Sequence, residues 1–253
     1  MRFILLTLFS VFLTPSCQSI LMPKVDTSTM SRSLVATPGL SNYEYARRLQ
    51  KDGWPVAELN TAEHSHYFDD DEKNIILAHN LVRYNPKKFA QLYVAEYISY
   101  FNEKKFHYPG IQTIMITHEG AKPAIELYRE LMNTRPMGLL IPSYGLTQAA
   151  RLHVNYLVEN NTRGHMGLGG LRARVERFGS WDNVLGENIS YGNFSAHDAL
   201  LFMLIDDEVF DRSHRMIILN PHFNFIGVGK DYHPGFPTGS TYVINYANHF
   251  IRQ

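Results

Sequence analysis

The chain has 253 residues, and its 24 Lys and Arg residues balance its 24 Asp and Glu residues, which gives a formal net charge of zero. This balance argues against a basic surface for nucleic acid, so we expect no nucleic-acid partner. The length is sufficient for one domain with a full hydrophobic core.

The N-terminus has the pattern of a secretory signal. Arg2 precedes an apolar run at residues 3–13, and the small residues Ser16 and Ser19 follow it. This order of charged, apolar and small residues is typical of an export signal, and the run is too short to span a bilayer. We therefore predict a signal peptide at residues 1–19. The mature protein is expected to be secreted, periplasmic or extracellular, without a transmembrane segment.

Cys17 is the single cysteine of the chain. Either cleavage removes it, or it becomes a lipid-modified N-terminus that anchors the protein. Thr14 and Pro15 depart from the usual lipoprotein pattern, so simple export is favoured and the anchor is the alternative. One cysteine cannot form a disulfide within the chain, and stability must come from packing.

Residues 20–71 are predicted to form a linker and an N-terminal extension. The first part, up to about residue 41, is rich in Ser, Thr, Pro and Gly with little apolar periodicity. Residues 42–70 mix aromatic and charged side chains, and no fold is predicted for them. We expect His64 and His66 in this polar stretch to be exposed to solvent rather than bound to a metal.

The ordered domain is predicted to cover residues 72–253, with helices in its first part. An apolar stripe from Ile75 to Val82 predicts a helix that Asn85 and Pro86 end. Further helices are predicted over residues 121–132, 143–157 and 195–204. His153 lies inside the apolar stripe of the 143–157 helix, so we expect a buried, hydrogen-bonded core residue.

The strands are predicted in the last part of the chain. Alternating polar and apolar residues indicate strands near 188–191, 224–230 and 241–248, and the last two are expected to form a hairpin. Early helices followed by antiparallel strands favour an α+β fold over a doubly wound sheet.

Polar groups that packing does not require occur in four segments, at residues 163–167, 186–189, 206–208 and 213–215. They carry His165, Glu187, three consecutive acids and His214. Two imidazoles and two carboxylates could bind zinc, or they could form a neutral hydrogen-bonded network lining a cleft. The spacing leaves both open. No compact zinc signature and no Gly-x-Ser-x-Gly nucleophile elbow occurs.

The order of these motifs resembles a bacterial-type CAP domain, also called an SCP domain. The resemblance rests on Gly164-His165, Gly186-Glu187-Asn188-Ile189, His214-Arg215 and Phe225-Ile226-Gly227-Val228-Gly229, and it runs from about residue 72 to 247. The superfamily contains cysteine-rich secretory, antigen 5 and pathogenesis-related proteins. The resemblance implies a three-layer α-β-α sandwich with a central antiparallel sheet.

The resemblance also implies a cleft that holds two histidines and two acids. His165 and His214 match the paired histidines, and Glu187 matches the first acid. The second acid is expected from residues 206–208, with Asp207 preferred over Asp206 and Glu208. In some proteins of this superfamily the two histidines bind zinc or another divalent metal, which makes His165 and His214 the candidate ligands here, while others resemble sterol and fatty-acid carriers or act through surface contacts.

The main functional hypothesis is a secreted, non-catalytic binding protein that holds a divalent metal or a small or lipidic ligand in this cleft. The first alternative is a metal-dependent, peptidase-like hydrolase in which Glu187 acts as general base. The second alternative is a purely structural cleft, with function through surface contacts to an extracellular protein partner.

Overall fold

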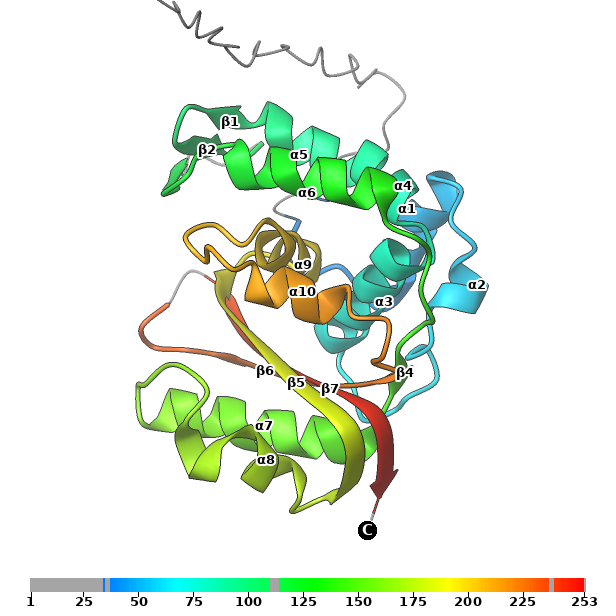
Figure 1. Cartoon of the computed structure of the whole chain (residues 1–253), viewed down its shortest axis with the longest axis vertical. Helices are drawn as coiled ribbons and strands as arrows, with labels where there is room; N and C mark the ends of the chain where they lie inside the picture. Colours follow the sequence, from blue (N-terminus) through cyan, green and yellow to red (C-terminus); the bar gives the residue numbers. More distant parts are fainter. Residues whose placement is uncertain (1–33, 35–36, 110–113, 237–238, 253) are drawn as a thin grey trace, which may run out of the picture.

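The computed structural model describes residues 34, 37–109, 114–236 and 239–252 (Figure 1). The signal peptide predicted at residues 1–19, and with it Cys17, lies outside these residues. Across the described ranges, no helix is both long and apolar enough to cross a membrane.

A four-stranded sheet with the strand order β4-β6-β7-β5 forms the centre of the molecule (Figure 1). Its strands are β4 (Ile141–Pro142), β5 (Gly179–Asn193), β6 (Phe225–Tyr232) and β7 (Ser240–Arg252). β7 pairs antiparallel with both β5 and β6, while the two-residue β4 pairs parallel with β6. The predicted antiparallel sheet and the β6–β7 hairpin are confirmed, and β5 is a long strand at the edge of this sheet.

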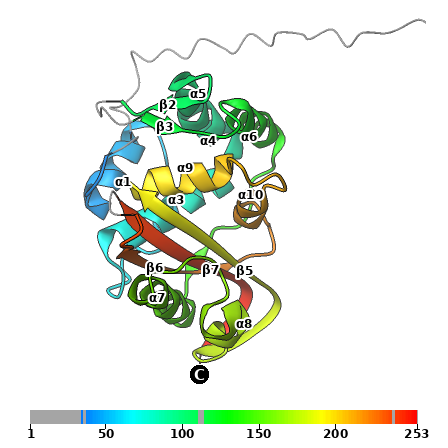
Figure 2. The ribbon, with the colours of Figure 1, turned by 90° about the vertical axis from the view of Figure 1, so that its left-hand side faces the viewer.

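One face of the sheet is covered by α7 (Tyr144–Glu159) and α8 (Gly170–Val175), as Figure 2 shows. α7 begins where the Ser143 hydroxyl accepts a hydrogen bond from the backbone of Leu146. Its backbone lies directly against β6, because a Cβ atom at Gly227 would come within 2.2 Å of α7 backbone atoms. Glycine at this position therefore sets how closely helix and sheet pack.

The opposite face is covered by α3 (Asp70–Tyr84), α9 (Ala196–Ile205) and α10 (Ser213–Ile218) (Figures 1 and 2). α3 begins with a capping box between Asp69 and Glu72. Near its end, the fully buried Arg83 donates hydrogen bonds to the carbonyls of Gly138 and Phe223. The three layers confirm the predicted α-β-α sandwich.

A further group of elements lies beyond α9 (Figure 1). It comprises α4 (Pro86–Phe89), a π-helical turn (Ala90–Val94), α5 (Ala95–Ser99), α6 (Lys122–Asn133) and a small sheet of β1 (Phe101–Asn102), β2 (Lys105–His107) and β3 (Ile114–Ile116). The predicted helix at 121–132 is confirmed as α6. The small antiparallel sheet lies between two predicted helices, in a segment for which the sequence analysis predicted no strand.

Two helices that the sequence analysis did not predict precede α3. They are α1 (Asn42–Lys51) and α2 (Val56–Leu59), and a capping box between Ser41 and Glu44 starts the first. Both helices contact α3, and Tyr45 and Trp54 are part of the main hydrophobic core. The folded unit thus begins before residue 72.

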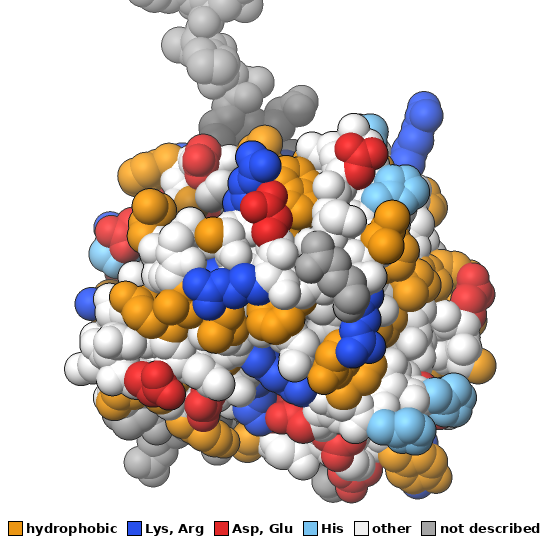
Figure 3. All heavy atoms as spheres, turned by 90° about the horizontal axis from the view of Figure 1, so that it is seen from below, with side chains coloured by type: hydrophobic (Ala, Val, Ile, Leu, Met, Phe, Trp, Pro, Cys, Tyr) orange, Lys and Arg blue, Asp and Glu red, His pale blue; other side chains and the backbone are white. Residues whose placement is uncertain are grey.

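On the face that carries α7 and α8, acidic and basic side chains are interspersed with apolar ones (Figure 3). His64 and His66 are exposed, as expected from the sequence.

Candidate functional site

A cleft of about 340 Å³ is lined by residues of β5, α10 and the α8 region, and three of the predicted site residues are among them. Its lining consists of His165, Leu171, Leu185, Gly186, Glu187, Asn188, Ser213, His214 and Ile217. The loop before α8 supplies His165, β5 supplies Glu187, and α10 supplies His214. The fold therefore brings together side chains that lie far apart in the sequence.

His165 is half exposed, and its ring is oriented by Glu187. The Nδ1 atom lies 2.8 Å from Oε1 of Glu187. Two contacts to Gly164 hold the loop in place. Nε2 of His153 lies 2.9 Å from the carbonyl oxygen of Gly164, and the backbone N–H of Gly164 donates to the Tyr191 hydroxyl at 2.9 Å. His153 is fully buried and hydrogen-bonded, as predicted. Burial lowers the pKa of His153, so the neutral ring donates from Nε2.

Glu187 is buried beside an arginine that the sequence analysis did not identify. Nη2 of Arg174 lies 2.8 Å from Oε1 and 2.6 Å from Oε2 of Glu187, and both side chains are at most 2% exposed. Nη1 of Arg174 also donates to the carbonyl of His165 at 2.9 Å. One buried cation thus holds both the carboxylate and the loop that carries the first histidine.

His214 is paired with Asp206. Its Nδ1 atom lies 2.6 Å from Oδ1 of Asp206, and its backbone N–H donates to Oδ2 at 3.0 Å. Asp206 ends α9 in the left-handed conformation with φ 59°, and its side chain is 3% exposed.

The structure corrects the expected second acid from Asp207 to Asp206. The carboxylate of Asp207 accepts hydrogen bonds from the backbone N–H groups of His118 and Glu119 at 2.7 and 2.8 Å. Glu208 pairs with the His118 side chain, and both are largely exposed. Asp206 and Glu208 both adopt the left-handed conformation, and the three consecutive acids contact different partners, which spacing alone does not reveal.

The Nε2 atoms of His165 and His214 are the imidazole nitrogens of the cleft that stay available to coordinate a metal. Each ring has a carboxylate at Nδ1, and within the described part of the chain neither Nε2 atom has a hydrogen-bond partner. A carboxylate at one ring nitrogen is the usual support of a metal-binding histidine, because it fixes the tautomer.

Both histidines line the same cleft, and the neutral imidazole nitrogen is a common ligand of zinc. Among the described residues, no group of three or more His, Cys, Asp or Glu side chains is arranged to hold an ion. The carboxylates of Glu187 and Asp206 contact the Nδ1 atoms of His165 and His214. Because zinc in proteins commonly has four ligands, the other positions would fall to water or a ligand.

The fold and the paired histidine–carboxylate cleft together define an SCP-type domain. The sequence matches the family described as the cysteine-rich secretory protein family (CAP) over residues 78–246. This match covers more than half of the chain, which therefore belongs to this family.

Two solved structures are similar to parts of the chain, and no curated protein matches it. An extracellular protein containing an SCP domain from Bacillus anthracis str. Ames is 23% identical over 50% of this chain, with a TM-score of 0.35. The match spans 38% of that protein. An outer surface protein from Borrelia burgdorferi is 17% identical over 49% of this chain and 84% of its own, with a TM-score of 0.35.

Proposed function

We propose that this protein is an exported, non-catalytic CAP-domain protein that binds a divalent metal such as zinc in the cleft. The observation that carries the proposal is that His165 and His214 each have a carboxylate at Nδ1 and a free Nε2 atom. When bound, the metal would supply a Lewis-acidic anchor for a polar ligand group. Export is inferred from the charged, apolar and small-residue order at the N-terminus.

The contacts of Glu187 favour binding over hydrolysis. Its carboxylate already accepts hydrogen bonds from Arg174 at both oxygens, in addition to the contact with His165. A general base needs a free lone pair within hydrogen-bond reach of the attacking water. The second acid, Asp206, is similarly engaged by His214. Both carboxylates are thus engaged in holding the histidines and Arg174, which favours the binding function over the hydrolase alternative.

The apolar wall of the cleft supports a small or lipidic ligand beside the metal. Leu171, Leu185 and Ile217 line it together with the two histidines. An apolar pocket with a few convergent polar groups is the common form of a small-molecule site. We infer that the metal would hold the polar end of such a ligand while the wall contacts its apolar part.

Zinc titration by calorimetry, with metal analysis of the purified protein, tests this function. We expect one zinc ion per chain, and loss of binding in the His165→Ala plus His214→Ala variant. The matched control is His222→Ala, because this exposed histidine lies outside the cleft. Equal metal content in wild type and the double variant would end the metal proposal. Chelator-sensitive turnover of peptides or esters that Glu187→Gln abolishes would favour the hydrolase instead.

A further inference from the structure

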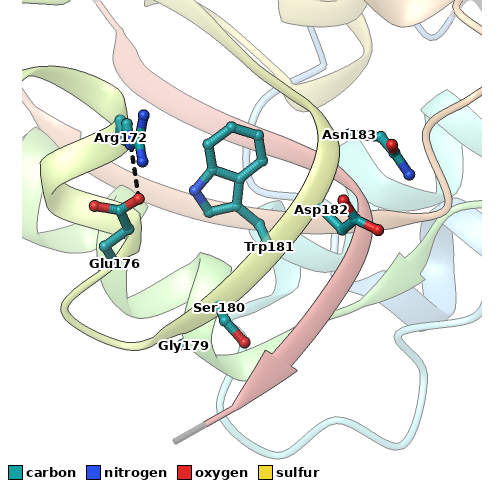
Figure 4. Close-up of a pocket in the computed structure, with 7 residues that line it drawn as sticks. All are labelled: Arg172, Glu176, Gly179, Ser180, Trp181, Asp182 and Asn183. Atoms are coloured by element: carbon teal, nitrogen blue, oxygen red, sulfur yellow. Dashed lines mark hydrogen bonds and ion pairs between the residues drawn. The ribbon is translucent and has the colours of Figure 1, made fainter.

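A second hollow, of about 560 Å³, lies along β5 next to the cleft. Its lining consists of Arg172, Glu176, Gly179, Ser180, Trp181, Asp182 and Asn183 (Figure 4). The cleft begins only two residues further along the strand, at Leu185. None of the histidines or acids of the cleft contributes to this hollow, so it is a separate candidate site.

The backbone of β5 is irregular where it forms the hollow. Side chains of a regular strand alternate between its two faces, so three consecutive residues would not line one recess. Here the pairing with β7 contains one extra residue between Asp182 and Leu185, and Asn183 adopts the left-handed conformation with φ 62°. Such a bulge re-aims side chains at a sheet edge. It allows Trp181, Asp182 and Asn183 to border the same recess.

The indole of Trp181 forms an aromatic surface in this hollow. The side chain is half-buried and packs on the cluster that contains Leu146 and Val175. In Figure 4 the ring lies between the Arg172–Glu176 pair on one side and Asp182 with Asn183 on the other. The guanidinium of Arg172 lies over the ring as a cation–π contact, 5.8 Å from its centroid. In the described part of the chain, the indole N–H has no hydrogen-bond partner.

The charges of the hollow argue against an anionic ligand. Nε of Arg172 lies 2.7 Å from Oε1 of Glu176, so the positive charge at this site is already paired. Asp182 is exposed and has no ion-pair partner among the described residues. The net charge of Arg172, Glu176 and Asp182 together is negative, and it would repel phosphate, sulfate or carboxylate groups.

The polarity of the hollow argues equally against a lipid. Trp181 is the single large apolar side chain in the lining, whereas small-molecule sites for apolar ligands are mostly apolar. The other side chains supply acceptors at Asp182 and both donors and acceptors at Asn183 and Ser180. A ligand that matches this set is neutral, rich in hydroxyl groups and apolar on one face.

We propose that the hollow at Trp181 binds a neutral saccharide. The C–H face of a sugar ring would stack on the indole, and its hydroxyl groups would donate to Asp182 and exchange hydrogen bonds with Asn183. The proposal does not depend on metal binding, because the two histidines of the cleft lie outside the hollow. Loss of zinc binding would leave saccharide binding intact.

Binding to an array of neutral and acidic glycans tests this proposal, followed by calorimetry with the best neutral oligosaccharide. We expect neutral glycans to bind, acidic ones to bind less well, and Trp181→Ala to weaken binding by about tenfold or more. The matched control is Tyr43→Ala, which removes an aromatic side chain that is 69% exposed and lies outside the hollow. This control should bind like wild type.

Tryptophan fluorescence gives a second readout, because the chain has only two tryptophans and Trp54 is buried. In a Trp54→Phe variant, the neutral oligosaccharide should change the emission of Trp181 directly. Thermal unfolding of each variant confirms that it is folded. An absence of binding to every neutral glycan, or equal affinity of wild type and a folded Trp181→Ala variant, would overturn the proposal.

Discussion

The Nδ1 atom of His214 lies 2.6 Å from Oδ1 of Asp206, and the backbone N–H of the same histidine donates to Oδ2 at 3.0 Å. One carboxylate therefore fixes both the ring and the start of α10. Asp206 reaches this position because its backbone is left-handed, with φ 59°.

Asp206→Asn is expected to lower zinc affinity by about tenfold or more, the usual cost of losing a carboxylate that supports a metal-binding histidine. Asparagine tolerates the left-handed conformation, so the backbone should be retained. Asp207→Asn is the matched control, because Asp207 contacts the backbone of His118 and Glu119 rather than the cleft. Calorimetric zinc titration of the two variants measures the difference. Equal affinities would contradict the assignment of Asp206 as the second acid.

Arg174→Met is expected to reduce the free energy of unfolding by about 3–5 kcal/mol, because it leaves the buried carboxylate of Glu187 without its cation. Arg172→Met should change it by less than about 1 kcal/mol, since the ion pair of Arg172 with Glu176 is exposed. Urea denaturation measures both effects. The double variant Arg174→Met plus Glu187→Gln should lose less than the sum of the single changes. Simple additivity would show that the two side chains are not coupled.

Glu119→Gln is expected to destabilise the protein in a pH-dependent manner. The bidentate hydrogen bonds from Arg212, at 2.7 and 2.9 Å, lower the pKa of Glu119 from 4.5 to about 2. A lowered folded-state pKa stabilises the fold above the unfolded value, and this contribution is lost as the pH falls from about 4.5 to about 2. At pH 7 the variant should lose about 1–2 kcal/mol, and the difference from wild type should shrink toward pH 2. A difference that does not change with pH would refute this.

Two buried histidines are expected to destabilise the fold in mild acid. Burial lowers the pKa of His79 from 6.5 to about 4 and that of His197 to about 3. Below pH 6.5 the unfolded chain binds protons that the folded chain does not, so stability falls as the pH falls. Each group contributes a slope of about 1.4 kcal/mol per pH unit down to its folded pKa.

His79→Gln tests this slope. Glutamine could reproduce the contacts of the ring with the Ile75 carbonyl and the Tyr246 hydroxyl without binding a proton. The free energy of unfolding between pH 4 and 6.5 should then depend less steeply on pH than in wild type. The exposed His222→Gln variant should keep the wild-type slope, and an unchanged slope in His79→Gln would refute the prediction.

Local sequence was sufficient to single out three of the segments that meet in the cleft. His165, Glu187 and His214 lie in short segments whose glycines and polar residues are not explained by packing, and the structure places all three in one cleft. Helical stripes and strand alternation favoured an α+β fold, since these patterns report which face each element buries, whereas the three-layer sandwich was implied by the resemblance to the CAP family.

The missed residues depend on contacts that local sequence does not contain. Arg174 lies in a short helix where an arginine would ordinarily face solvent, and only the folded chain shows Glu187 beside it. Asp206 differs from its acidic neighbours by its contact with His214, which depends on how the backbone turns after α9 and which three consecutive acids do not reveal. The capping box between Ser41 and Glu44 is the sequence pattern that indicates the start of α1. The mixed aromatic and charged residues after it gave no clear helical pattern.

The packing of α1 and α2 on α3 has a practical consequence for any shortened form of this protein. The family match begins at residue 78, inside α3, whereas Tyr45, Trp54 and Leu59 fill the core from earlier in the chain. A recombinant fragment that begins at residue 78 would lack the first half of α3. It would also expose to water the apolar surface that α1 and α2 cover, so we expect it to aggregate. The segment that matches the family is therefore shorter than the segment that must fold as one unit.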